Sequence, residues 1–279
     1  MKKTIRFLDC GANIGQSIDW AIEVLSGYDF KIDSFEPNPS LMPIIKDRFF
    51  NNKEKINLHQ VAIDVIEREK TFYLQDWGAR TGSSLVKGKE STIHRVGVIG
   101  QLCYVEQDGT TVKQLKVSWN KEEFEKAGTL VDIDEPPVFV QYMPSEALIE
   151  ILNDPKYTIE NEHELFNTVE VQTINFPLWL EENINEDELI ILKLDIEGTE
   201  FEVVDKIIKS GLNEKIDVLL VEWTPEQRML SCSAFVSGVD ERIELRKLTK
   251  EKFRLVLDWK KPEECKEPVK NFLKEKENA

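Results

Sequence analysis

"FLDCGANIG", residues 7–15, joins a short apolar stretch to two glycines and the start of an amphipathic helix pattern. The apolar residues at 5–9 predict a strand, and apolar residues at 3–4 spacing between Ile14 and Leu25 predict a helix that ends near Gly27. A strand, a glycine turn and a helix in this order are typical of the first unit of a parallel sheet. The stretch therefore predicts the start of an α/β fold.

The alternation of strand and helix continues through most of the chain. Further strands are predicted at residues 32–36, 56–63, 189–195, 216–222 and 253–259, and further helices at 39–50, 200–209 and 242–252. We expect these elements to form one mostly parallel, twisted sheet flanked by helices. We expect residues 1–259 to form a single domain and residues 260–279 to form a charged tail, frayed or loosely helical.

The regular alternation breaks between residues 86 and 167, which we interpret as an insertion. Residues 102–119 alternate apolar and polar positions around Asp108-Gly109, which predicts a β-hairpin. Residues 143–152 predict a capped helix. We expect this hairpin and helix insertion to cap the substrate side of the sheet.

The overall composition argues against several classes of protein. The 279 residues carry a formal charge of −16, which disfavours nucleic acid as a partner because nucleic-acid affinity rests on Lys and Arg. No apolar run is long enough to span a bilayer and no signal-peptide pattern follows Met1, so we expect no membrane insertion and a cytoplasmic location. The four cysteines and three histidines lack metal-ligand spacing, which predicts neither a zinc site nor a disulfide framework. The oligomeric state is left open.

Asp9 bears on which ligand the glycine turn favours. A dinucleotide, a free phosphate and S-adenosylmethionine all suit such a turn, but a carboxylate two residues before Gly11 repels a diphosphate. The spacing of Asp9, Gly11, Asn13 and Gly15 also differs from the dinucleotide and Walker patterns. We therefore predict S-adenosylmethionine, with Asp9 serving its cationic side and backbone N–H groups at the helix start serving its carboxylate. A tight turn without a ligand is the alternative.

"SFEPNP", residues 34–39, follows the second predicted strand. Glu36 is expected at the carboxyl edge of the sheet, where a carboxylate accepts hydrogen bonds from both ribose hydroxyls. Pro37 and Pro39 restrict the backbone around Glu36, and we expect Asn38 to cap the next helix with Pro39 at its first position. This pattern predicts a rigid binding edge, with a solvated strand end as the alternative.

"ILKLDIEGTEFEVV", residues 191–204, places charged residues in and after a strand that should be buried. Lys193 and Asp195 point to the same side of that strand. We predict catalytic roles for Asp195, Lys193 and Glu197, with Asp195 orienting or deprotonating the hydroxyl of a methyl acceptor. The alternatives are a structural ion pair for Lys193 and simple helix N-terminal charge for Glu197 and Glu200.

Glu222 ends the following strand and should reach the same rim as Asp195. We predict no metal site, and these two carboxylates are the pair that a metal ion would use. Glu222 is instead assigned to the substrate side.

Six blocks of the chain resemble the FkbM family of S-adenosylmethionine-dependent methyltransferases. The blocks are "DCGANIG" at 9–15, "FEPNP" at 35–39, "HQVAI" at 59–63, "GSSL" at 82–85, "VQTINFPLWL" at 171–180 and "LKLDIEGTEFEVV" at 192–204. They follow the family's order and the resemblance covers about half of the chain. It implies a class I (Rossmann-like) methyltransferase fold and O-methylation of sugars or other small hydroxyl compounds.

The resemblance also implies site residues, matched block by block. The expected cofactor site comprises Asp9, Gly11, Ala12, Asn13, Gly15, Ser17, Glu36, Pro37, Asn38, Ala62 and Asp195, with Ala62 beside the adenine. Ser83 and Ser84 of the "GSSL" block are expected to close the cofactor pocket or to touch the substrate, although a plain turn accounts for the two serines equally well. His94 and Glu222 lie outside the six blocks and are expected on the substrate side without a motif. Tyr104, Trp119 and Tyr142 of the insertion are further substrate candidates, and Cys10 departs from the family's small apolar residue.

Together these features predict an S-adenosylmethionine-dependent O-methyltransferase acting on a hydroxyl of a sugar or glycan. Three alternatives stay open. They are methylation of a non-sugar secondary metabolite, a non-catalytic nucleoside-binding module that recognises a protein partner, and a nicotinamide-dependent reductase, which Asp9 disfavours.

Overall fold

The structure is a computed structural model that describes most of the chain. The described residues are 3–74, 83–85, 102–105, 111–116, 139–141, 158–159, 167–223 and 239–278. The chain divides into two compact units. The first comprises Met1–Thr71, Glu170–Thr224 and Ser237–Ala279, and the second comprises Phe72–Val169 and Pro225–Val236.

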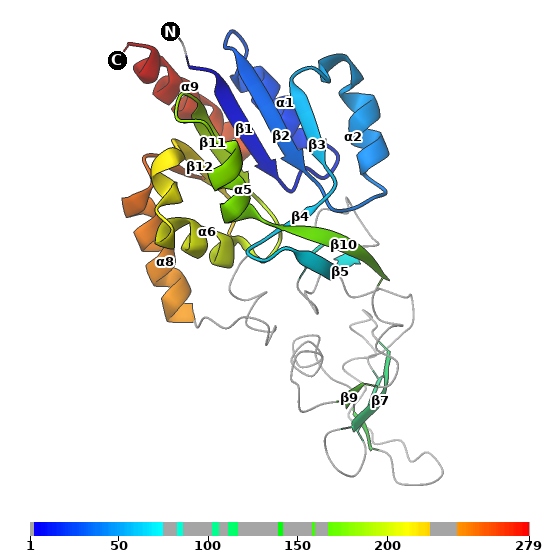
Figure 1. Cartoon of the computed structure of the whole chain (residues 1–279). Coiled ribbons are helices and arrows are strands. Elements are labelled where there is room, and N and C mark those ends of the chain that lie inside the picture. Colours follow the sequence, from blue (N-terminus) through cyan, green and yellow to red (C-terminus); the bar gives the residue numbers. More distant parts are fainter. Residues whose placement is uncertain are drawn as a thin grey trace. The chain divides into compact units, whose positions relative to one another are not determined.

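A six-stranded sheet forms the centre of the first unit (Figure 1). Its strands, in spatial order, are β13 (Val256–Asp258), β12 (Val218–Val221), β11 (Leu189–Leu194), β1 (Ile5–Cys10), β2 (Phe30–Phe35) and β3 (Ile56–His59). Every neighbouring pair is parallel. The chain thus builds the sheet outward from β1 in one direction and then from β11 in the other, which makes the gap between β1 and β11 the topological switch point. The prediction of a mostly parallel α/β sheet is confirmed.

Helices cover both faces of this sheet. Alternate residues of its buried strands point to opposite faces, and they pack against the helices in two separate apolar clusters. Ile5 and Phe7 of β1 belong to the cluster that also contains residues of α1 (Gln16–Val24) and α9 (Pro262–Asn278). Leu8 and Cys10 belong to the cluster that contains residues of α5 (Phe176–Asn183) and α6 (Glu200–Lys209). The remaining described helices are α2 (Met42–Arg48), α8 (Val239–Lys252) and the 3₁₀ turns η1 (Phe50–Asn52) and η4 (Leu212–Lys215).

The expected strand at 56–63 is split, because Ala62–Asp64 form a separate strand, β4, that pairs with Thr173–Asn175 of β10 (Asn167–Asn175) instead of continuing beside β2. With β5 (Arg68–Leu74) these strands make a three-stranded sheet of order β4-β10-β5.

The expected helix at 39–50 begins only at Met42. Asn38 Oδ1 accepts a hydrogen bond from Ser40 N at 3.0 Å, and Asn38 O accepts one from Leu41 N at 3.1 Å. These bonds hold residues 38–41 in a turn. Asn38 therefore does not cap the helix, and Pro39 lies in the turn before it.

The C-terminal segment is an ordered part of the core, in contrast to the loose tail that we expected. Cys265, Val269 and Leu273 of α9 recur at intervals of four residues and are all buried. The indole of Trp20 donates a hydrogen bond to Pro262 O at 2.8 Å and packs edge-on against Trp259. Apolar residues at helical spacing thus outweigh the charged composition of this segment.

The second unit contains a four-stranded sheet of order β8-β6-β7-β9. β6 (Leu102–Val105) and β7 (Thr111–Lys116) pair antiparallel, which confirms the predicted hairpin. β8 (Phe139–Gln141) and β9 (Thr158–Ile159) flank them. The predicted helix at 143–152 lies outside the described residues, and the role of the insertion as a substrate cap stays a prediction.

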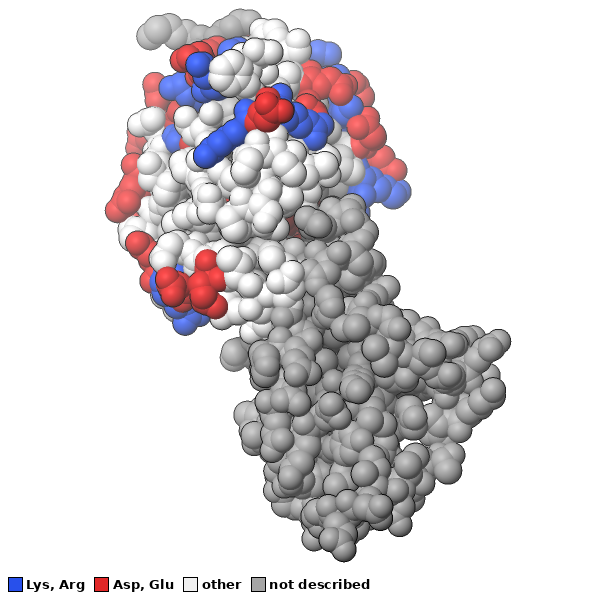
Figure 2. Space-filling model, turned by 90° about the vertical axis from the view of Figure 1, so that its right-hand side faces the viewer, with Lys and Arg blue, Asp and Glu red and all other residues white. Residues whose placement is uncertain are grey.

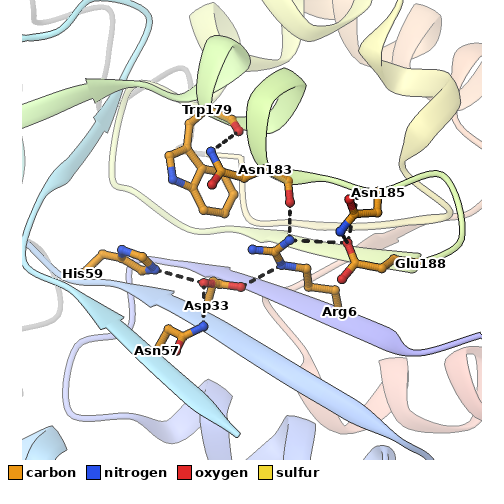
Figure 3. A network of polar contacts seen from close by, with 8 residues as sticks. All are labelled: Arg6, Asp33, Asn57, His59, Trp179, Asn183, Asn185 and Glu188. Carbon is orange, nitrogen blue, oxygen red and sulfur yellow. Dashed lines mark hydrogen bonds and ion pairs between the residues drawn. The ribbon is translucent and has the colours of Figure 1, made fainter.

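A polar network joins the strands to α5 on one face of the sheet (Figure 3). The buried carboxylate of Asp33 accepts hydrogen bonds from Arg6 Nε at 2.8 Å and Asn57 Nδ2 at 3.2 Å, and it lies 3.0 Å from His59 Nε2. Arg6 also donates to the backbone oxygen of Asn183 at the end of α5. Burial opposes the charge of Asp33, but the bonds from His59 and Arg6 outweigh it, so the pKa of Asp33 lies below its usual value.

We predict that Asp33→Asn lowers the free energy of unfolding by about 3 kcal/mol, because it removes the nearer carboxylate partner of the half-buried Arg6 and leaves only Glu188, at 3.3 Å, to balance its charge. Asp205→Asn is the matched control, since the Asp205–Lys209 pair is exposed, and it should cost less than about 1 kcal/mol. Denaturant unfolding of both variants measures the difference. Equal losses would contradict a stabilising role for this network.

The turn after β1 packs directly against the turn after β11. Gly11 has φ +87°, and a Cβ at this position would overlap the backbone oxygen of Asp195. Gly15 has φ +91°, and a Cβ there would overlap the ring of Phe49. Both glycines are therefore required by contacts inside the protein, in addition to their left-handed backbone.

We expect Gly11→Ala to be more destabilising than Gly27→Ala, although both glycines have positive φ. A Cβ at Gly27 meets no atom within 4 Å, so this control reports the left-handed conformation alone, about 1–2 kcal/mol. Gly11→Ala should cost about 1–3 kcal/mol more, because the two turns must move apart. Thermal or denaturant unfolding tests this, and similar values for the two variants would show that the contact is unimportant.

Candidate functional site

The candidate site lies at the carboxyl ends of β1, β2 and β11, beside the topological switch point. Open α/β sheets bind ligands at this edge. Three turns meet here, at residues 11–15 after β1, 36–41 after β2 and 195–199 after β11. All of them belong to the first unit.

Every backbone N–H of the glycine turn is bound to an oxygen of the protein. Gly11 N and Ala12 N both donate to Phe35 O, at 3.0 and 3.1 Å, and Gly15 N donates to Ala12 O at 2.8 Å. Asn13 N donates to Glu36 Oε2 and Ile14 N donates to the Asn13 side chain, each at 2.8 Å. The turn is thus tied to β2, and its N–H groups at 11–15 bind protein oxygens. The helix start, where we expected the cofactor carboxylate, follows at Gln16 of α1, and that role stays a prediction.

Glu36 is a buried acceptor at the end of β2, with 6% of its surface exposed. One oxygen accepts from Asn13 N and the other from Asn38 N, both at 2.8 Å. A carboxylate has about four acceptor positions, so two are left for donors from a ligand. Burial raises the pKa of Glu36 to about 7, against the opposing effect of these two N–H groups.

Asp9 is enclosed below the turn and fully buried. It lies in register with Ser34 of β2 and Lys193 of β11. Its Oδ2 accepts from Ser34 Oγ at 2.8 Å, and its Oδ1 lies 3.3 Å from Lys193 Nζ. Because a lysine balances its charge, Asp9 does not make the turn selective for a cationic ligand in the way we expected.

Lys193 forms the ion pair that we weighed as its alternative role. Its ammonium donates to Gly11 O at 2.6 Å and Cys10 O at 3.2 Å, and lies 3.6 Å from Asp195 Oδ2. Burial lowers the pKa of Lys193, but the charges of Asp9 and Asp195 raise it more, so the group stays protonated. Only 1% of Lys193 is exposed. The predicted catalytic role of Lys193 therefore has no direct support from its position.

Asp195 is partly exposed at this edge, with 27% of its side chain accessible, as are Glu197 and Glu222. Its backbone N–H donates to Cys10 O at 3.2 Å, which joins the two turns. Glu197 and Gly198 follow with positive φ, at 61° and 137°. The backbone of Asp195 is therefore bonded to the end of β1 and is followed by a tight turn at Glu197 and Gly198.

Glu200 holds the turn after β11, a role that the sequence analysis missed. Its carboxylate accepts from Ile196 N and Gly198 N, at 3.0 to 3.2 Å, and is fully buried. Burial raises the pKa of Glu200 to about 7. Thr199, at the start of α6, bonds Ile63 O at 3.4 Å instead of capping the helix. The carboxylate two residues after Gly198 was the available signal for this role.

Glu222 lies on the same rim, and its N–H donates to Leu194 O at 2.9 Å. Burial, followed by the charges of Asp195 and Glu197, raises the pKa of Glu222 to about 6. Within the described ranges, no group of three or more His, Cys, Asp or Glu side chains could hold a metal ion. A metal at Asp195 and Glu222 gains no support from this arrangement.

The other predicted site residues are placed as follows. Ala12 and Ser17 are buried near the glycine turn, Pro37 lies between Glu36 and Asn38, and Ala62 is buried in β4. Ser84 pairs with Tyr73 in the second unit, next to Ser83. Tyr104 lies on β6 of that unit. His94, Trp119 and Tyr142 lie outside the described residues, so their substrate roles stay predictions.

Charges of both signs are mixed on the face drawn in Figure 2, where Lys and Arg side chains lie beside Asp and Glu side chains. The coloured atoms of that view show no continuous basic area. Among the described helices, none is both long and apolar enough to cross a bilayer.

Comparison with known proteins supports the resemblance found in the sequence. No curated protein and no solved structure gave a significant match. A family model does match, and its range contains β11, Lys193, Asp195 and Glu222, whereas the glycine turn and Glu36 precede it. Residues 137–244, less than half of the chain, match the Methyltransferase FkbM domain, the family that the sequence resembles.

Proposed function

We propose that this protein is an S-adenosylmethionine-dependent O-methyltransferase acting on a hydroxyl of a sugar or glycan. The match to the FkbM domain supports methyl transfer. The observation that carries the cofactor assignment is Glu36, a buried carboxylate at the ligand-binding edge with acceptor positions left over. The two ribose hydroxyls of a nucleoside fit these positions.

The bonding of the glycine turn argues against a dinucleotide. A dinucleotide fold presents backbone N–H groups at the helix start to the diphosphate. Here the N–H groups of residues 11–15 already donate to protein oxygens. The turn itself therefore offers no backbone donor to the diphosphate of a nicotinamide cofactor, which would have to use the N–H groups of α1 from Gln16 onward.

Bound S-adenosylmethionine would supply a methyl group on a cationic sulfur for direct displacement by the acceptor oxygen. The residues of the chain then have two tasks. Glu36 binds and orients the nucleoside, and Asp195, exposed at the switch point, accepts the proton of the acceptor hydroxyl or orients it. Glu197 and Glu222 add negative charge at the same rim.

The first test measures cofactor affinity against pH. Ribose hydroxyls donate to the ionised form of Glu36, whose pKa is about 7, so binding should weaken about tenfold between pH 8 and pH 6. Glu36→Gln should weaken binding at pH 8 by about tenfold and remove this pH dependence. Isothermal titration calorimetry measures both effects, with the exposed Glu54→Gln as the matched control. An affinity that Glu36→Gln leaves unchanged would refute the ribose assignment.

The second test measures turnover with labelled methyl donor and a panel of glycans. Asp195→Asn should lower kcat by about 10²-fold or more, with cofactor affinity within about threefold of the original. Undiminished turnover would remove Asp195 from the catalytic residues. Cofactor binding without transfer to any glycan or small hydroxyl compound would favour the nucleoside-binding module. A rise in melting temperature with NAD in place of the adenosyl cofactor would favour the reductase.

A further inference from the structure

Lys193 contacts oxygens on both sides of the switch point. On one side lie Gly11 O at 2.6 Å, Cys10 O at 3.2 Å and Asp9 Oδ1 at 3.3 Å, all from β1 and its turn. On the other lies Asp195 Oδ2 at 3.6 Å, two residues along its own strand. One buried ammonium thus faces two carboxylates and two backbone carbonyls.

We propose that Lys193 is a positioning residue. Its ammonium holds the Asp195 carboxylate next to the glycine turn, in the place where this carboxylate meets the acceptor hydroxyl. This inference rests on the proposed function. It differs from a catalytic role, because a side chain that is 1% exposed and surrounded by protein oxygens does not reach a substrate. It also differs from a purely structural pairing with Asp9, because the same ammonium lies near the partly exposed Asp195.

The geometry of Asp9 supports this distinction. Asp9 Oδ1 has no hydrogen bond of good geometry, whereas Lys193 does donate hydrogen bonds to the two carbonyls of the turn. An ammonium has three N–H donors, and the two carbonyls take two of them. The third donor is left for the two carboxylates, Asp9 Oδ1 at 3.3 Å and Asp195 Oδ2 at 3.6 Å from Nζ. Lys193 therefore links the turn, the buried acid and the exposed acid through one charged group.

The backbone makes this link effective. Asp195 N donates to Cys10 O, which Lys193 also contacts, and Gly11 packs on Asp195 O. The main chain of Asp195 is thus held by β1, while its side chain has Lys193 as its charged neighbour. A displacement of about 1 Å at a reacting group costs about 10²-fold in rate, so a small loss of alignment is measurable.

The experiment compares Asp9→Asn with the double variant Asp9→Asn, Lys193→Met. Lys193→Met alone leaves a buried Asp9 charge unpaired and serves as the unstable reference, whereas the double variant removes both charges and should regain much of that stability. Relative to Asp9→Asn, we expect the double variant to lower kcat by about tenfold or more, with less than about threefold change in KM for the cofactor. Lys193→Arg, which keeps the charge, should recover part of kcat.

Hydrogen exchange supplies a readout that does not need activity. Amides of residues 195–198 should exchange faster in the double variant than in Asp9→Asn, while those of β12 keep their protection. Unchanged kcat, or unchanged exchange in residues 195–198, would overturn the positioning role. If the original protein transfers no methyl group, the proposed function fails separately, and the exchange comparison alone decides whether Lys193 orders this turn.

Discussion

The contact between Gly11 and the backbone of Asp195 is the constraint on which the rest of the site depends. Parallel strands on either side of a switch point send their connections to opposite faces of the sheet, so the turns at that point usually leave a crevice. Here a glycine lets the two turns approach until a single Cβ would not fit. Lys193 lies beneath them and supplies the positive charge that this concentration of carbonyls and carboxylates requires.

This packing changes how the two glycines of the turn should be interpreted. A glycine turn after a strand suggests a backbone left bare for a ligand, but Gly11 faces Asp195 and Gly15 faces Phe49. The N–H groups of residues 11–15 are likewise used internally. In the proposed function, selectivity among nucleotides would rest on Glu36 and on the internal bonding of that turn, whereas the charge of Asp9 is balanced by Lys193.

Local patterns in the sequence were sufficient for the six strands of the parallel sheet and for α1, α2, α6 and α8, whereas β5, β10 and α5 were not predicted. α6 has the predicted bounds, and Gly211, with φ 74°, follows it. Interactions between distant segments were not predictable from such patterns. The split at 56–63 depends on pairing with β10, more than 100 residues away, and the burial of Arg6 depends on Asp33 and α5. The charged composition of residues 260–279 led us to expect a loose tail, but three buried apolar residues of α9 decide how this segment packs.

Glu36 and Glu200 are held by the same kind of bonding, and Glu36 is the candidate binding group of the two. Glu36 follows β2 and Glu200 begins α6, both accept backbone N–H groups of a turn, and burial raises both pKa values to about 7. Glu200 is fully buried, whereas Glu36 keeps 6% of its surface exposed at the ligand edge. A buried carboxylate gains most from additional hydrogen-bond donors, because burial has removed its water. Glu36 can gain such donors from a ligand, and Glu200 can gain them only from the protein.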